Sequence, residues 1–138
     1  MSVKLSVCII TYNHENYIKQ CLESVLNQRT DFDFEIIVGD DCSTDRTQEI
    51  VEDYRRRYPS IIKTIFQQER TGGALNYENV HSLAAGEYVA HLDGDDIFAP
   101  NKLRLQVQKL DENTDINILW HRVNIFNDHG LSVCRPDG

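Results

Sequence analysis

The feature that most constrains the fold is a regular alternation of short apolar runs with stretches of helical periodicity. The apolar runs, rich in Val and Ile, are typical of buried β-strands. The predicted strands cover residues 5–10, 34–39, 61–66, 87–92 and 117–126. Strands that alternate with helices over short loops indicate an α/β fold with an open, twisted, mostly parallel sheet flanked by helices. The 138 residues fit one such domain.

Helical patterns fill the segments between the predicted strands. The first has one apolar face, formed by Ile18, Cys21, Leu22, Val25 and Leu26. Asp45 with Gln48 resembles a helix cap, and Pro59 ends that second helix. A weaker pattern follows Thr71-Gly72-Gly73 and reaches Ala85, where Gly86 is expected to be the C-cap. The last helix is expected to start at Pro100.

Polar residues follow three of the predicted strands, at the points where the strands end. Ligands of open α/β sheets bind outside the carboxyl ends of the parallel strands, so these residues are the candidates for a site. They are Thr11, Tyr12 and Asn13 after the first strand, Asp40 and Asp41 after the second, and Asp93, Asp95 and Asp96 after the fourth. Carboxylates crowded at one edge either retain protons or share a cation, and oxygen ligands suit Mg²⁺ or Mn²⁺. We therefore expect a divalent ion at this edge.

Each of these candidates also has an ordinary structural interpretation. Asp and Asn are common turn formers, and for Asp40-Asp41 that alternative weighs as much as the functional one. It is weaker for Asp93-Gly-Asp-Asp96, because like charges repel one another in so short a turn. Tyr12 could pack in the core or stack on a planar base.

Four segments together resemble the consecutive motifs of the family 2 glycosyltransferases of the GT-A fold. They are SVCIITYN (6–13), EIIVGDDCSTD (35–45), AGEYVAHLDGDD (85–96) and PNKL (100–103). The resemblance runs from about Lys4 to Leu110 in the family's order. It implies an inverting transferase that moves a sugar from a nucleotide-sugar donor, with UDP expected as the nucleotide, to a hydroxyl of a glycan or lipid-linked acceptor in polysaccharide biosynthesis.

The resemblance also implies roles for individual residues. Thr11, Tyr12, Asn13, Asp40 and Asp41 would hold the nucleoside, with Tyr12 against the base and Asp41 or Asp40 accepting from its edge. Asp93, Asp95 and Asp96 would form the DxD-type cluster, in which Asp93 and Asp95 also contact the donor and all three are candidate metal ligands for Mn²⁺ or Mg²⁺.

The sequence departs from the family pattern in two loops. Cys42 stands where Gly or Asn is common after the acidic pair. The glycine loop continues as Gly73-Ala-Leu-Asn76 instead of bringing an Arg-Asn pair, so phosphate contacts from that loop are in doubt.

Charge and composition exclude other classes of protein. Asp and Glu number 22 against 14 Lys and Arg, a net charge of −8, which disfavours nucleic acid as a partner. The apolar runs are too short to span a bilayer, so we expect a cytoplasmic protein, with the inner face of the membrane as an alternative. The basic run Arg55–Arg57 could touch an anionic membrane, but it more often complements a helix dipole. Cys8, Cys21, Cys42 and Cys134 are expected to be free thiols.

The catalytic base has no obvious place in this sequence. The carboxylates after the DxD-type cluster are Asp111, Glu112, Asp115, Asp128 and Asp137, and none has a clear route to an acceptor hydroxyl. We therefore expect residues 1–138 to be one nucleotide-sugar-binding domain, truncated on its C-terminal, acceptor side. The alternative is a non-catalytic nucleotide-sugar-binding module or regulatory fragment. A nucleotidyltransferase would need a basic, Gly-rich loop after the first strand, and an aspartyl phosphatase would carry its acidic motif there.

Overall fold

The computed structural model describes residues 2–127 and 130–134, and it confirms the predicted alternation of strands and helices. Its elements follow one another as β1 (Leu5–Thr11), α1 (Ile18–Leu26), β2 (Phe34–Asp40), α2 (Thr47–Arg57), β3 (Ile62–Phe66), α3 (Gly73–His81), β4 (Tyr88–Asp93), α4 (Lys102–Glu112), β5 (Val123–Asn127) and β6 (Gly130–Cys134).

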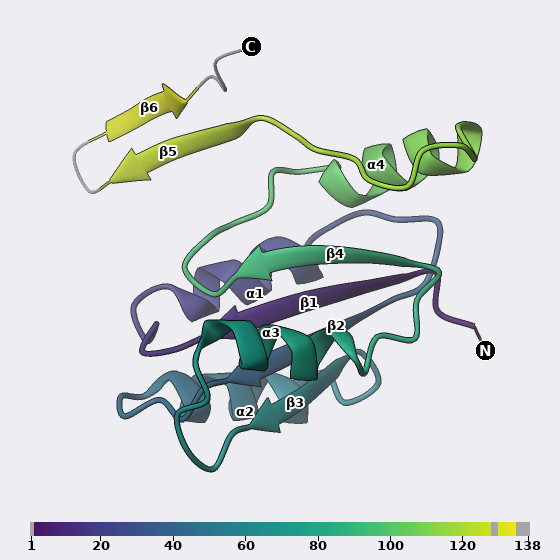
Figure 1. The fold of residues 1–138 in the computed structure, drawn as a ribbon. Helices are drawn as coiled ribbons and strands as arrows, with labels where there is room; N and C mark the ends of the chain where they lie inside the picture. The colour runs from purple at the N-terminus through teal and green to yellow at the C-terminus, as the bar shows by residue number, and fades with distance from the viewer. Residues whose placement is uncertain (1, 128–129, 135–138) are drawn as a thin grey trace. The chain divides into compact units, whose positions relative to one another are not determined.

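Four of the strands form one parallel sheet in the order β3-β2-β1-β4. Figure 1 shows α1 and α2 on one face of this sheet and α3 on the other. The register pairs Thr11 of β1 with Asp40 of β2, and Ile10 of β1 with Asp93 of β4. Since the strands are parallel and in this register, the polar residues that end them lie at the same edge.

The core has two apolar layers because successive side chains of a strand point to opposite faces. Cys8, Ile37 and Val80 form a buried cluster on the α3 side, with Ile10, Ile65 and Ala84 packed against it. The predicted face of α1 is buried as well, with Ile18, Cys21, Leu22 and Val25 inaccessible to solvent. The periodicity of the sequence therefore identified the layer on the α1 side, whereas the weak pattern of α3 did not indicate Val80.

Two glycines allow close approaches between elements. A Cβ on Gly39 would lie 2.2 Å from Cγ2 of Val80 and 2.6 Å from Oδ1 of Asn76, so only glycine lets α3 pack this tightly on β2. A Cβ on Gly86 would lie 2.5 Å from the backbone N of Ser6. The prediction that Gly86 caps a helix is therefore wrong: α3 ends at His81 with Ser82 as its C-cap, and Gly86 is needed for packing against β1.

The predicted strand over residues 117–126 is real only in its second part. Within the described residues, β5 begins only at Val123, and it pairs antiparallel with β6 in a separate two-stranded sheet. The chain divides into two compact units, residues 1–105 and 106–138, and this hairpin belongs to the second. The periodicity of apolar residues shows which side chains are buried, but it does not show which strand a segment pairs with. The extent of β5 is set by its pairing with β6, so the sequence pattern could not predict it.

Candidate functional site

The carboxyl ends of β1, β2 and β4 are joined by backbone hydrogen bonds that continue past the strands. The amide of Asp41 donates to the carbonyl of Thr11 (3.0 Å), and the amide of Gly94 donates to the carbonyl of Ile10 (2.9 Å). The three predicted loops therefore lie side by side. All the residues predicted for the site, Thr11–Asn13, Asp40, Asp41, Asp93, Asp95 and Asp96, lie in the first unit at this edge.

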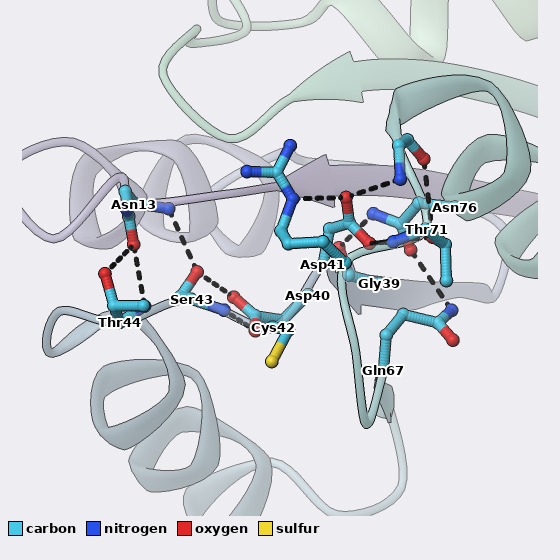
Figure 2. Close-up of polar contacts among 12 residues, drawn as sticks. Asn13, Gly39, Asp40, Asp41, Cys42, Ser43, Thr44, Gln67, Thr71 and Asn76 are labelled. Atoms are coloured by element: carbon cyan, nitrogen blue, oxygen red, sulfur yellow. Dashed lines mark hydrogen bonds and ion pairs between the residues drawn. The ribbon is translucent and has the colours of Figure 1, made fainter.

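Asp40 is enclosed within the β2 loop. It is inaccessible to solvent, and its carboxylate accepts hydrogen bonds from the amide and hydroxyl of Ser43 and from Nε2 of Gln48 (2.7 Å). Figure 2 shows the bonds to Ser43. Gln48 thus reaches back to Asp40, while Asp45 binds the first turn of α2 through the amide of Thr47 (2.9 Å). In this arrangement Asp40 organises the loop.

Asp41 has every acceptor position of its carboxylate engaged. Oδ1 accepts from the amide and the hydroxyl of Thr71, both at 2.7 Å, and Oδ2 accepts from the amide of Gly72 (2.9 Å) and from Nε of Arg70 (3.0 Å). Figure 2 shows the contact with Thr71. Burial alone would raise the pKa of Asp41, but these hydrogen bonds outweigh it and lower the pKa below the ordinary value. Hydrogen bonds from the protein therefore take the place of water around the Asp41 carboxylate and stabilise its charged form.

Arg70 joins the two residues predicted to bind a nucleoside base, and sequence reasoning missed it. Its guanidinium carbon lies 3.4 Å from the centroid of the Tyr12 ring while its Nε donates to Asp41. A signal was present, because Arg70 directly precedes the Thr71-Gly72-Gly73 loop that follows β3. The family pattern places its basic residue after the glycines, whereas in this chain the basic residue, Arg70, lies before them.

Asn13 and Cys42 both have left-handed backbone conformations, with φ of 52° and 62°. Asn tolerates this region because its short polar side chain can bond locally. Here Oδ1 of Asn13 accepts from the backbone amide of Thr44 (2.8 Å), and the backbone amide of Asn13 donates to Oγ of Ser43 (2.9 Å), as Figure 2 shows. Asn13 therefore links the first loop to the second. The positive φ of Cys42 explains why Gly or Asn suits that position.

Asp93, Asp95 and Asp96 are the only described group of at least three acidic, His or Cys side chains whose ligand atoms could share an ion. One carboxylate oxygen of each lies within 4.8 Å of the others. Burial, followed by the charges of Asp95 and Asp93, raises the pKa of Asp96. An all-oxygen, mutually repelling donor set fits a hard divalent cation such as Mg²⁺ or Mn²⁺.

His14 connects this acidic triad to the first loop. Its Nδ1 lies 2.9 Å from Oγ1 of Thr11, and its Nε2 lies 3.8 Å from Oδ2 of Asp95. A Cβ on Gly94 would lie 2.6 Å from Oγ1 of Thr11 and 2.9 Å from Nδ1 of His14, so the glycine of the DxD-type motif permits this contact. His14 directly follows the candidate residues Thr11–Asn13, but nothing local in the sequence indicates that its ring reaches Asp95 far along the chain.

Two other predictions concern the surface and the thiols. Arg55 and Arg56 pair with Glu52, and Arg57 with Asp53, so the basic run is largely neutralised along its own helix. Cys8 and Cys21 are free and buried, as predicted, and Cys42 is free. Burial, with a smaller effect of Glu35, raises the pKa of Cys8 to about 12. In the part of the chain that the structure describes, no helix has the length and apolar character needed to cross a membrane.

The sequence matches the family model described as Glycosyl transferase family 2 over residues 6–132. Among curated relatives, the uncharacterized protein Rv1520 of Mycobacterium tuberculosis is 39% identical over 127 residues. That alignment covers 91% of this chain and 37% of Rv1520. The chain therefore spans well under half the length of this relative.

The chain also resembles solved structures of glycosyltransferases. Residues 1–349 of TarS from S. aureus, solved in complex with UDP, match with a TM-score of 0.72 and 36% identity, over 81% of this chain and 33% of that one. The mannosyltransferase PcManGT from Pyrobaculum calidifontis, in complex with GDP-Man and Mn²⁺, matches with a TM-score of 0.72 and 26% identity, over 83% and 34%. Both are GT-A glycosyltransferases, which confirms the predicted fold type.

Proposed function

This chain belongs to glycosyl transferase family 2, and from that premise we propose that it is the donor-binding part of a longer, inverting glycosyltransferase. The observation that carries the proposal is the meeting of Tyr12, Asp41 and the carboxylates of Asp93, Asp95 and Asp96 at one edge of the sheet. An aromatic ring and a buried acceptor suit a nucleoside base, and the acidic triad suits a divalent cation on the diphosphate.

The nucleoside is assigned to the loops after β1 and β2. Tyr12 would stack on the base, Asp41 would accept from a ring N–H, and Thr11 and Asn13 would line the same loop. Asp40 would not contact the nucleoside itself but would hold the loop in place, since its oxygens accept hydrogen bonds from Ser43 and Gln48. UDP is the proposed nucleotide because its base offers such an N–H, and the TarS complex with UDP supports this choice.

The diphosphate is assigned to the acidic triad through a divalent ion. Asp93, Asp95 and Asp96 would hold Mn²⁺ or Mg²⁺, with Asp93 and Asp95 facing the donor. The ion would supply the positive charge that the diphosphate leaving group needs. Its presence in the PcManGT complex supports the proposal.

The transfer itself would be an in-line displacement. The acceptor oxygen bonds to the anomeric carbon on the face opposite the diphosphate, the bond from that carbon to the diphosphate oxygen breaks, and a carboxylate base takes the hydroxyl proton. We propose that this base lies in the remainder of the longer protein. Asp111, Glu112 and Asp115 follow the site in the chain but belong to the second unit, and Asp128 and Asp137 lie outside the described residues.

The acceptor is proposed to be a glycan or lipid-linked glycan hydroxyl. Arg55, Arg56 and Arg57 each pair with an acidic residue of the same helix, which reduces the charge available for an anionic membrane surface. The second candidate function is a non-catalytic module that binds a nucleotide sugar.

Calorimetry with UDP, in Mn²⁺ and in chelator, tests the donor site. We expect tighter binding with Mn²⁺, because the acidic triad repels a bare diphosphate. Equal affinity in both conditions would refute the metal assignment, and failure to bind any nucleoside diphosphate would refute the donor site. The longer protein is then incubated with donor and acceptor, and mass spectrometry detects any acceptor that has gained a sugar. An enzyme gives this product, whereas a binding module does not.

A further inference from the structure

A side chain of the protein itself occupies the position proposed for the base. The guanidinium of Arg70 lies 3.4 Å from the centroid of the Tyr12 ring, the distance of a stacked planar group. The same side chain donates from Nε to Oδ2 of Asp41 (3.0 Å). A planar group that stacks on an aromatic ring and donates an N–H to a carboxylate makes the two contacts expected of a uracil or guanine ring.

Asp41 cannot accept from a base while this arrangement persists. A carboxylate has about four acceptor positions, and the four are taken by the two groups of Thr71, the amide of Gly72 and Nε of Arg70. Gly72 is the N-cap of α3, so the backbone donors are held by the start of that helix. Arg70 is the one donor on a long side chain, half exposed, that can leave without backbone movement.

We propose that Arg70 is an internal surrogate for the nucleoside base, which closes the site in the free protein and must leave both Tyr12 and Asp41 before a nucleotide binds. This inference rests on the proposed function, because it takes Tyr12 and Asp41 as the base contacts. The apparent affinity for a nucleoside is then lower than the intrinsic affinity by the fraction of molecules in which Arg70 has moved away.

This competition makes a prediction of unusual sign. Removal of a side chain that lies in a binding site normally weakens binding, because its contacts with the ligand are lost. Here the Arg70→Ala variant should bind uridine, which has no phosphate, roughly three- to tenfold more tightly than the unaltered chain. Arg70→Lys retains the charge but lacks a planar group to stack, so it should lie between the two.

The experiment is an NMR titration of the chain with uridine, for the unaltered protein, Arg70→Ala, Arg70→Lys and a control, Arg56→Ala. The control removes the same charge from an exposed side chain whose ion pair, at 3.7 Å to Glu52, lies on α2. In the free protein the Hε resonance of Arg70 should be shifted by the Tyr12 ring, and saturating UDP should abolish that shift.

The outcomes separate this inference from the proposed function. If the unaltered chain binds UDP but Arg70→Ala binds uridine equally or more weakly, the surrogate role is refuted and the donor site stands. If Arg70 keeps its ring-shifted resonance in saturating UDP, the surrogate role is refuted as well. If neither UDP nor uridine binds any variant, the donor site fails, and the inference fails with it.

Discussion

The acidic loops after β2 and β4 lie at the same edge of the sheet, but their carboxylates have different surroundings. Asp40 and Asp41 are buried, yet their oxygens accept hydrogen bonds from the surrounding loops, and the pKa of Asp41 is lowered. Asp93, Asp95 and Asp96 face one another, and burial and mutual repulsion raise the pKa of Asp96. The difference teaches that similar acidic motifs can have their oxygens saturated by protein donors or left close to one another.

The largest expected difference between the two loops concerns folding stability. Asp40→Ala should lower the free energy of unfolding by about 2–4 kcal/mol, because the amide of Ser43 and Nε2 of Gln48 lose a charged acceptor inside the protein. Asp95→Ala should change it by no more than about 0.5 kcal/mol, since this side chain is half exposed. Urea unfolding measures both, and equal losses would contradict the contrast.

The next effect is the response to a divalent ion. Mn²⁺ at about 100 times its dissociation constant should stabilise the chain by about 2.7 kcal/mol. Asp96→Asn should abolish most of this gain, because it removes a charge from the triad. Asp53→Asn removes an exposed carboxylate on α2 and serves as the control. Stabilisation by Mn²⁺ that persists in Asp96→Asn, measured by thermal unfolding, would place the ion elsewhere.

Acid should affect the two loops with opposite signs, by less than the ion does. The folded pKa of Asp41 is lowered, so its stabilising effect is present above its unfolded pKa of about 3.9 and is lost as the pH falls through the folded value. The penalty of Asp41→Asn should therefore shrink below about pH 4.

The pKa of Asp96 is raised, so its charged form destabilises the folded state above that pKa. Asp96→Asn should stabilise the metal-free chain near neutral pH, and this gain should decline as the pH falls through the raised pKa. Urea unfolding of the unaltered chain, Asp41→Asn and Asp96→Asn from pH 3 to 7 tests both trends. If stability depends on pH in the same way in the two variants, the pKa shifts of Asp41 and Asp96 do not have opposite directions.

The smallest effect comes from the backbone of the β2 loop. Cys42→Gly should stabilise the chain by about 0.5–1 kcal/mol, because glycine adopts a φ of 62° without the steric cost of a Cβ. Cys42→Ser keeps the Cβ and should give no such gain. If serine stabilises as much as glycine, loss of the thiol rather than relief of the backbone is responsible.

Several features of this protein could be predicted from local patterns. Apolar periodicity identified β1 to β4, the buried face of α1 and the parallel α/β class, because burial of one face imposes a period on the sequence. The rule that ligands bind at the carboxyl ends of parallel strands selected Tyr12, Asp41 and the acidic triad as candidates, and the structure brings their loops to one edge. The four ordered motifs predicted the family that the comparisons show.

Other features depended on residues far apart in the chain. The pairing of β5 with β6, the role of Gly86 against Ser6 and the position of His14 all required the folded chain. The opposite pKa shifts of Asp41 and Asp96 did so as well, because the donors to Asp41 come from residues 29 to 31 positions away. Local sequence determines which groups are present, whereas only tertiary contacts decide which of them are solvated, paired or left to repel.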